Sequence, residues 1–303
     1  MKTKDKSSLR TVGYSFVGVV CVGGVLLLAS SAQAQNLFVS NPATGKITEI
    51  TPDGVQSTFA SGVRGAYGLA FNSAGDLFVA EYSRGNIYEF TPGGVRSTFA
   101  SVGNVEVLAF DSAGNLFASS ISGYIYKFTP DGVRSTFAVG VSANGLAFDS
   151  AGNLFVTSGG AVGYIYKFTP DGVQSTFASG LSYPTGLAFN SAGVLFDTET
   201  SLINIGGKIN AFTPEGVKST FASGLDDPLG LAFDSAGNLY EADYVNINEF
   251  TPDGVQSTFA TGIGPAGLAF QGVNLPVPEP STLSLLAAGA TALVVCCRRK
   301  LVA

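Results

Sequence analysis

The segment TPDGVQSTFA at residues 51–60 decides the fold, because close copies of it occur six times along the chain. The copies begin at residues 51, 91, 129, 169, 213 and 251, so they are 40, 38, 40, 44 and 38 residues apart. A second segment, close to GLAFDSAGNLF, keeps step with the first and begins at residues 68, 107, 145, 186, 230 and 267. A period near 40 residues, built of short apolar runs and Gly/Pro turns, is typical of a β-propeller, because one such unit cannot bury both of its faces alone. Six copies predict six blades.

Each unit contains four short runs that we expect to form four strands. In the third unit these runs span residues 107–110, 115–119, 124–128 and 134–138. The connections DSAG and TPDG place Pro and Gly where tight turns need them, so the first and third connections are predicted to be hairpins. The first two runs are nearly continuously apolar, which indicates strands that are buried on both faces.

The two ends of the repeat array are complementary halves of one unit. The array opens at residues 36–39 with a second strand that has no first strand before it, and it finishes at residues 267–270 with a first strand that has no second. Pairing the halves removes exposed sheet edges. We therefore predict an all-β, six-bladed propeller of four-stranded blades over residues 35–272, with an open solenoid or another blade number as the alternative.

Residues 1–34 have the composition of a secretory signal peptide. A basic start precedes an apolar stretch at residues 12–29, and Ala32-Gln33-Ala34 forms a small-x-small cleavage site. An uncleaved membrane anchor is the alternative. A lipoprotein signal at Cys21 is disfavoured, because the residues before it lack the small side chain that such a site needs.

Residues 273–303 combine a linker with an apolar segment. The sequence VPEPST at residues 277–282 is followed by 15 uncharged, mostly apolar residues at 283–297 and then by Arg298, Arg299 and Lys300. A helix over 283–297 would be about 22 Å long, which is marginal for a hydrocarbon core of about 30 Å. The basic cluster is expected to stay in the cytoplasm, which leaves the repeat domain outside.

This tail resembles the PEP-CTERM sorting tail of exported bacterial proteins, with Pro278, Glu279 and Pro280 as its motif and Arg298 and Arg299 in its basic cluster. The resemblance implies handling by an exosortase-type membrane protease in bacteria that make extracellular polysaccharide. It also implies transient anchoring in the inner membrane and delivery to the cell surface or beyond. A plain C-terminal anchor with a Pro-rich linker is the alternative.

The repeat itself resembles the NHL repeat and the related gluconolactonase and strictosidine-synthase-like propellers. The likeness rests on GLAFDSAGNLFV at residues 145–156 together with GYIYKFTPDG at residues 163–172, and it extends over the whole domain. There is no Trp, so the sequence is not of the WD-repeat type. A likeness at this level specifies the fold and leaves the function open.

Composition excludes several function classes. The two ends contain seven of the 16 basic residues and two of the 22 acidic ones, so the domain has nine and 20 and a formal net charge of −11. That charge argues against nucleic acid or an anionic membrane surface as a partner. The three cysteines lie in the two ends, so the domain has neither a disulfide nor a thiol nucleophile. The absence of histidine removes the usual general base and every histidine-based metal site.

Candidate functional residues lie on the variable face of the predicted disc. The hairpin turns of the repeat barely change among the six copies, whereas the other two sets of connections differ in every copy, as ligand-binding loops do. The candidates are Asn41, Arg64, Tyr67, Glu81, Glu106, Asn144, Tyr183, Asp197, Glu199, Asp226, Asp227, Glu241 and Asp243. This acidic ring offers only oxygen ligands, which suit Ca²⁺ or hydrogen bonds to a sugar or peptide. The repeated Asp111, Asp149 and Asp234 are interpreted as turn-forming residues.

The lactonase resemblance transfers poorly at the level of single residues. Asn144 stands where those enzymes have the metal-binding Asn of a Pro-Asn-Gly motif, but Leu229 and Pro265-Ala266 occupy places where they have a ligand Asp and a ligand Glu. We therefore interpret Asn144 as a turn-capping residue and the domain as an exported binding or matrix-associated structural module, with a glycan or matrix polysaccharide as the expected ligand. The competing function is a lactonase-like or other hydrolase that uses an acidic central opening.

Overall fold

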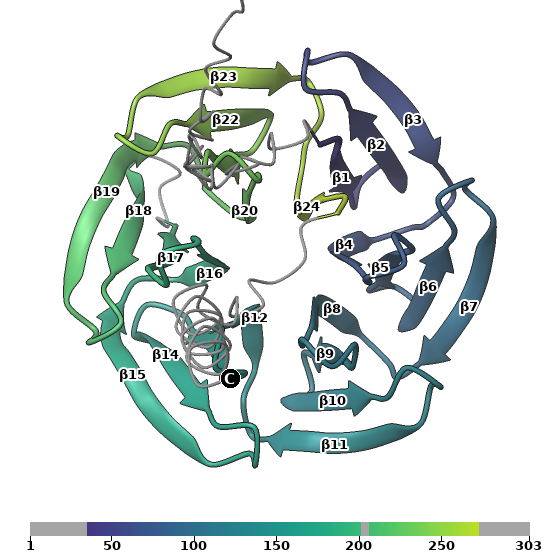
Figure 1. The fold of residues 1–303 in the computed structure, drawn as a ribbon, viewed down its shortest axis with the longest axis horizontal. Coiled ribbons are helices and arrows are strands. Elements are labelled where there is room, and N and C mark those ends of the chain that lie inside the picture. Colours follow the sequence, from purple (N-terminus) through teal and green to yellow (C-terminus); the bar gives the residue numbers. More distant parts are fainter. Residues whose placement is uncertain (1–34, 201–205, 273–303) are drawn as a thin grey trace, which may run out of the picture. The chain divides into compact units, whose positions relative to one another are not determined.

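The computed structural model describes residues 35–200 and 206–272, which form 24 β-strands in six four-stranded antiparallel sheets. We number the sheets as blades 1 to 6 in chain order. Their inner strands β24, β4, β8, β12, β16 and β20 meet at the centre of a ring, and the outer strands form its rim (Figure 1). The prediction of six four-stranded blades is confirmed.

Each blade runs from an inner strand at the centre of the ring to an outer strand at its rim. In that order, blade 1 contains β24 (Leu268–Phe270), β1 (Leu37–Asn41), β2 (Lys46–Ile50) and β3 (Gln56–Ala60); blade 2 contains β4 (Ala66–Phe71), β5 (Leu77–Glu81), β6 (Asn86–Phe90) and β7 (Arg96–Ser101); blade 3 contains β8 (Val105–Phe110), β9 (Leu116–Ser120), β10 (Tyr124–Phe128) and β11 (Arg134–Val139). Blade 4 contains β12 (Ala143–Phe148), β13 (Leu154–Gly159), β14 (Gly163–Phe168) and β15 (Gln174–Leu181); blade 5 contains β16 (Pro184–Phe189), β17 (Leu195–Glu199), β18 (Gly207–Phe212) and β19 (Lys218–Leu225); blade 6 contains β20 (Leu231–Phe233), β21 (Leu239–Ala242), β22 (Asn246–Phe250) and β23 (Gln256–Thr261).

Blade 1 closes the ring with strands from both ends of the domain. β24 pairs with β1 in the register Leu37↔Phe270 and Val39↔Leu268. Beyond the ladder, the Ser40 amide donates to the carbonyl oxygen of Gly267 at 3.0 Å. The predicted pairing of the two half-units is confirmed, and it leaves no unpaired inner strand among the described residues.

The repeated turns form as their sequences predict. In the TPDG turn, Gly54 has a φ of 79° and donates its N–H to the carbonyl of Thr51 at 2.8 Å. In the DSAG turn, a carboxylate oxygen of Asp111 accepts the N–H groups of Ala113 and Asn115 at 3.0 and 2.8 Å. The aspartates of this turn therefore act on their own backbone, as expected for Asx turns.

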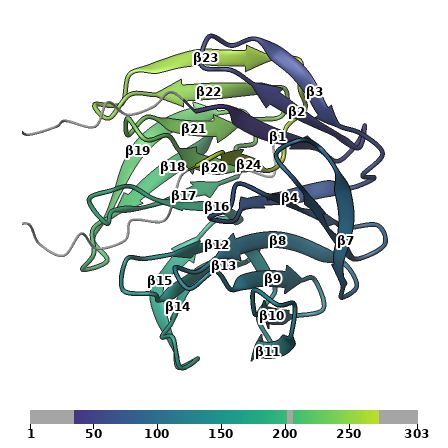
Figure 2. The same cartoon turned by 45° about the vertical axis from the view of Figure 1, so that its right-hand side comes forward.

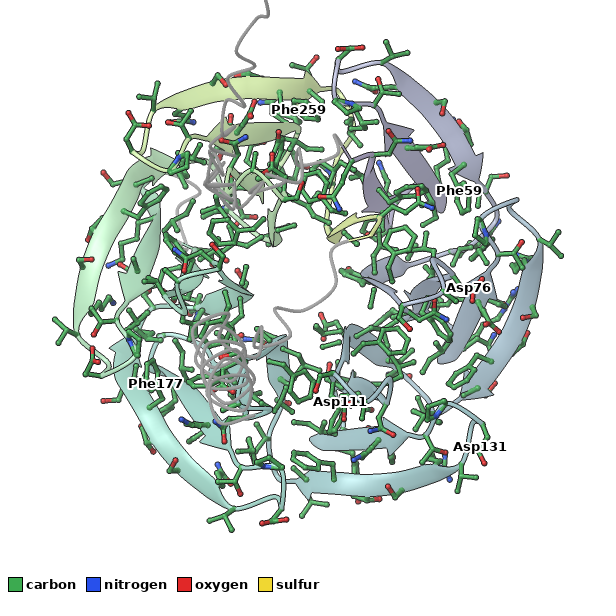
Figure 3. All side chains as sticks on the ribbon, in the orientation of Figure 1. Phe59, Asp76, Asp111, Asp131, Phe177 and Phe259 are labelled. Carbon is green, nitrogen blue, oxygen red and sulfur yellow. The ribbon has the colours of Figure 1, made fainter. Side chains whose placement is uncertain are left out.

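Aromatic side chains fill the interfaces between blades. On the second strand of blade 1, Phe38 makes edge-to-face contacts with Phe59 of its own blade and with Phe71 of blade 2, both at 5.0 Å between ring centroids. Equivalent groups occur at the other interfaces, where Tyr240 takes the role of Phe38 in blade 6. Phe59, Phe177 and Phe259 mark three of these interfaces around the ring (Figure 3). Such pairs add to the apolar burial that holds neighbouring blades together.

Inner strands of successive blades lie side by side from β4 through β8 and β12 to β16 (Figure 2). Among the described residues no helix is long and apolar enough to cross a membrane. The predicted signal peptide, the helix expected at 283–297 and the sorting residues lie outside the described ranges.

Candidate functional site

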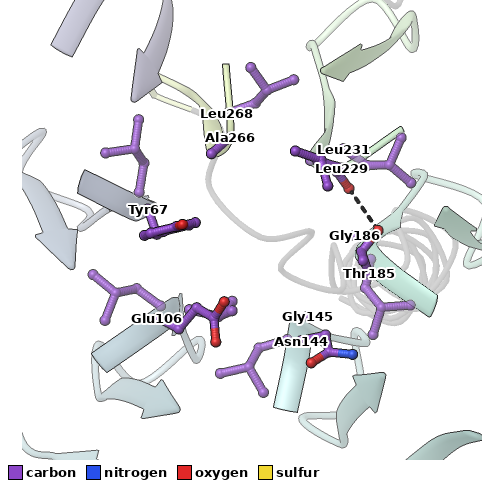
Figure 4. A pocket seen from close by; sticks show the side chains of 18 of the residues that line it. Tyr67, Glu106, Asn144, Gly145, Thr185, Gly186, Leu229, Leu231, Ala266 and Leu268 are labelled. Carbon is purple, nitrogen blue, oxygen red and sulfur yellow. Dashed lines mark hydrogen bonds between the residues drawn. The ribbon is translucent and has the colours of Figure 1, made fainter. Parts of the chain in front are cut away.

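A cavity of about 390 Å³ lies at the centre of the ring, where the six inner strands meet. Each inner strand contains or begins within a short motif, in which a variable residue is followed by Gly-Leu, or by Val-Leu in blade 3. The variable residues of all six blades line the cavity. Their side chains surround the opening in Figure 4. In blade order from 2 to 6 and then 1, they are Tyr67, Glu106, Asn144, Thr185, Leu229 and Ala266. The cavity thus has a polar wall from blades 2 to 5 and an apolar wall from blades 6 and 1.

Glycine at the second position of this motif lets neighbouring inner strands touch backbone to backbone. A Cβ atom on Gly145 would lie 2.2 Å from the carbonyl oxygen of Thr185, and one on Gly186 would lie 2.3 Å from that of Leu229. No side chain fits at such a distance. The close approach fixes the variable residues around a narrow ring.

Hydroxyl groups on the second strands hold the inner strands in place. Thr198 Oγ1 accepts the N–H of Gly186 at 2.7 Å and donates to the carbonyl of Leu229 in blade 6 at 2.8 Å. Ser40 Oγ likewise accepts the N–H of Gly267 at 2.9 Å and donates to the carbonyl oxygen of Tyr67 in blade 2 at 2.5 Å. The polar backbone groups around the cavity are therefore largely bonded within the protein.

Among the described residues that line the cavity, Glu106 is the one with a charged side chain. Burial raises the pKa of its carboxyl group, and no described residue forms a hydrogen bond or an ion pair with it. Tyr67 lies next to Glu106 in the ring. Burial raises the pKa of Tyr67, and the charges of Glu106 and Tyr82 raise it further. The ring centroids of Tyr67 and Tyr82 are 5.7 Å apart.

Asn144 uses its side-chain amide to bridge two blades. Its Nδ2 donates to the carbonyl of Gly159 at 3.1 Å and to that of Pro184 in blade 5 at 3.0 Å. The residue lies within β12 and not in a turn, so its role is to tie inner strands together where we expected a turn cap.

Tyr183 also lines the cavity, and its backbone is held in the left-handed region with a φ of 45°. Its N–H donates to the carbonyl of Gly160 at 2.7 Å, and its own carbonyl accepts the N–H of Thr200 at 3.3 Å. The equivalent position is Gly65 in blade 2 and Asn104 in blade 3, which suit this conformation better. A bulky aromatic residue here is strained, and strain of this kind gathers at functional sites.

Five of the candidate acids lie within blades and do not line the cavity. These five acids are buried, and they lie on or directly after the second strands of their blades: Glu81, Asp197, Glu199, Glu241 and Asp243. They form hydrogen bonds with side chains of the third strand or with the loop that leads to it. Asn41, at the place equivalent to Glu81 and Glu199, donates to the carbonyl of Ile263. Arg64 and Asp226 are exposed. The pKa of Asp227 is raised, first by burial and then by the charge of Asp226. A ligand role for these residues stays a prediction.

Blade 5 contains a buried group of carboxylates joined by an amide. Asn210 Nδ2 donates to Asp197 Oδ1 at 2.9 Å and to Glu199 Oε1 at 2.8 Å. Burial, only partly offset by the hydrogen bond from Asn210, raises the pKa of Asp197 to about 7. Burial also acts upward on the pKa of Glu199, but the bonds from Lys218 and the Ser182 amide and the nearby lysine charges outweigh it, so that pKa is lowered.

Blade 6 repeats this arrangement without the lysines. Asn248 Nδ2 donates to Glu241 Oε2 at 2.9 Å and to Asp243 Oδ2 at 3.3 Å, and burial raises the pKa of Glu241 to about 8. In blades 2 and 4 the same cross-strand positions hold Val79 with Tyr88 and Val156 with Tyr166. Blades 5 and 6 thus have an acid and an amide at positions where blades 2 and 4 have a valine and a tyrosine. Neither Asn210 nor Asn248 is among the sequence-based candidates, although aligning the six repeats would have revealed them.

Comparison with known proteins identifies the tail. Residues 276–300 match the PEP-CTERM protein-sorting motif. This chain carries a PEP-CTERM sorting signal. The signal indicates export and membrane-associated sorting and implies recognition by exosortase processing machinery, as the sequence predicted.

Solved structures similar to this chain are propellers of the predicted kind. A gluconolactonase from Xanthomonas campestris aligns with a TM-score of 0.61 and 17% identity over 78% of this chain and 88% of its own. Virginiamycin B lyase from Staphylococcus aureus aligns with a TM-score of 0.56 and 15% identity over 80% of this chain and 92% of its own. These alignments confirm the likeness to gluconolactonase-like propellers at the level of the fold, and at 15–17% identity they show no activity. No curated protein sequence is significantly similar to the chain.

Proposed function

We propose that this protein is an exported cell-surface propeller that acts as a binding module and holds a small ligand in its central cavity. The observation that supports this most is the division of one cavity into a polar and an apolar wall, formed by six residues at equivalent positions. Its volume of about 390 Å³ is within the range of small-molecule sites. Equivalent positions that differ in every blade are where a repeat fold adapts to a ligand.

The chemistry of the polar wall favours binding over hydrolysis. A hydrolase needs donors that stabilise a developing oxyanion and a base that activates a nucleophile. Here the amide of Asn144 is directed at two backbone carbonyls, and the backbone N–H of Gly186 is bonded to Thr198. Among the described residues, no three acidic side chains gather closely enough to hold a metal ion. The lactonase-like or other hydrolase remains the competing function.

Closing the cavity tests the proposal. Ala266→Phe would fill the apolar wall, and Val217→Phe, at a rim position that is 65% exposed, is its control. A small-molecule thermal-shift library measured on the exported protein should give ligands that the Ala266→Phe variant loses and the Val217→Phe variant keeps. Lactone hydrolysis that depends on cavity residues would instead establish the enzyme.

The sorting signal supports a two-stage route to the cell surface or extracellular matrix. The tail would first anchor the protein in the inner membrane with the propeller outside, and a protease would then cut near Pro278 to Thr282. Intact-mass measurement on protein from the cells that export it should find a C-terminus near this segment. A C-terminus at Ala303, in protein that stays with the inner membrane, would reduce the segment to a linker and anchor.

A further inference from the structure

The described residues that line the cavity bring one negative charge and no positive one. Glu106 contributes the carboxylate, and the nine basic residues of the domain all lie elsewhere. No described residue pairs with this carboxylate. A partly buried carboxylate without a counter-charge is costly, and a cation placed beside it would offset that cost.

The side chains of the polar wall mostly accept hydrogen bonds. Both amide hydrogens of Asn144 are used on the carbonyls of Gly159 and Pro184, so its Oδ1 is left as the acceptor. The hydroxyl hydrogen of Thr185 is directed at Thr198 Oγ1 or at the carbonyl oxygens of Pro228 and Leu229. The hydroxyl groups of the two lining tyrosines can donate as well as accept.

Backbone donors around the ring are engaged as well. The N–H of Val107 is bonded to Ser119 Oγ at 3.1 Å, that of Gly186 to Thr198, and that of Gly267 to Ser40. The N–H of Leu229 donates to the carbonyl of Ala242 at 2.8 Å. An anionic ligand, which needs donors, would find few of them here, whereas a ligand that brings its own donors would find acceptors.

Aromatic and apolar groups complete the surroundings. Tyr67 lies beside Glu106 in the ring (Figure 4), and the π-face of a tyrosine attracts cations. Leu229 of blade 6 lies across the cavity from Glu106, and Ala266 of blade 1 lies between Leu229 and Tyr67 in the ring (Figure 4). One leucine from each blade also lines the cavity. The carboxylate of Glu106 therefore faces an apolar side chain across the cavity.

We infer that the ligand is a small organic cation, an amine or ammonium group on an apolar body. Its cationic group lies against Glu106 and Tyr67, where the N–H of an amine also donates to Asn144 Oδ1, and its body contacts the wall formed by Leu229 and Ala266. This inference rests on the proposed function, because it names the class of ligand that the central cavity takes.

Four probes of similar size test this inference by calorimetry on the exported protein. Phenethylamine and benzyltrimethylammonium are the cations, phenethyl alcohol is the neutral probe and 3-phenylpropionate is the anion. We expect the cations to bind about tenfold or more tightly than the alcohol and the anion not to bind, because charge-assisted contacts exceed neutral ones by that amount. Glu106→Gln should remove this preference, while Glu215→Gln, in an exposed turn, should leave it unchanged.

The outcomes separate the two levels of the argument. Alcohol or anion binding that equals cation binding would overturn the ligand class and leave the cavity as a binding site. Cation binding that is the same in the Glu106→Gln variant would also overturn it, because the cation would then lie elsewhere. If no probe binds, and the small-molecule library gives no ligand that Ala266→Phe removes, the ligand class and the proposed binding function both fail.

Discussion

The side-chain amide of Asn144 in blade 4 donates to the backbone carbonyl of Pro184 in blade 5 at 3.0 Å. One side chain thereby connects two inner strands next to the cavity. Asn144→Leu would leave two carbonyl groups without their donor, and we expect it to lower the free energy of unfolding by about 1–3 kcal/mol. Urea denaturation measures this. Asn144→Asp should cost more at neutral pH, because a carboxylate would face those two carbonyls, and an unchanged stability of both variants would contradict the bridging role.

Gly186 and Gly93 offer a matched test of the backbone contact between inner strands. A Cβ on Gly186 would lie 2.3 Å from the carbonyl oxygen of Leu229, whereas a Cβ on Gly93 would lie 3.9 Å from its nearest neighbour. Gly186→Ala should therefore destabilise the domain by about 1–3 kcal/mol or more, as overpacking does, and Gly93→Ala should have little effect. Thermal unfolding of the two variants compares them directly. Equal melting temperatures would show that inner strands can move apart freely.

Buried carboxyl groups predict that stability falls as pH rises. Asp197 and Glu241 have folded-state pKa values of about 7 and about 8, and both are expected near 4 in the unfolded chain. Between these limits the folded chain binds more protons than the unfolded one, so the free energy of unfolding declines by up to about 1.4 kcal/mol per pH unit for each group. Glu199 does not add to this window, because its lowered pKa acts below about pH 4.

Denaturation midpoints at pH 5 and pH 9 check this dependence. Glu241→Gln should be more stable than the parent at pH 9 and should weaken the dependence, because the amide cannot ionise. Glu215→Gln is the control, since its side chain lies in an exposed turn. A parent protein that grows more stable from pH 5 to pH 9 would show that these carboxyls are ionised at little cost.

The fold could be predicted from the sequence because each blade repeats the same buried pattern and turn residues. Strand bounds were less accurate. The first strand of blade 3 was expected at residues 107–110 and is Val105–Phe110, because a register shift between Val105 and Leu108 lets the strand begin before its apolar run. The polar Glu106 conceals that start in the sequence.

The site was predictable only in part. Tyr67, Glu106, Asn144 and Tyr183 were chosen from variable loops, and the structure brings all four to one cavity. Thr185 was missed, although it occupies the same place in its repeat as Asn144. The cross-strand pairing of Asp197 with Asn210 joins residues 13 positions apart, and hydrophobic periodicity gives no sign of it.

Tyr183 gives the sharpest separation of stability from function. Its φ of 45° costs about 1–3 kcal/mol in a residue that is neither Gly nor Asn, while the residue is one of those that line the cavity. Asn occupies the equivalent place in blade 3, as Asn104 with a φ of 44°, so Tyr183→Asn should relieve the strain and leave the melting temperature equal or higher. The same variant should bind cavity ligands more weakly, because it loses an aromatic surface. Thermal unfolding and calorimetry on one preparation measure both effects, and Asn104→Gly is a control for backbone freedom alone. A Tyr183→Asn variant that is less stable and binds as well as the parent would mean that the tyrosine is retained for packing against Gly160 and not for a ligand.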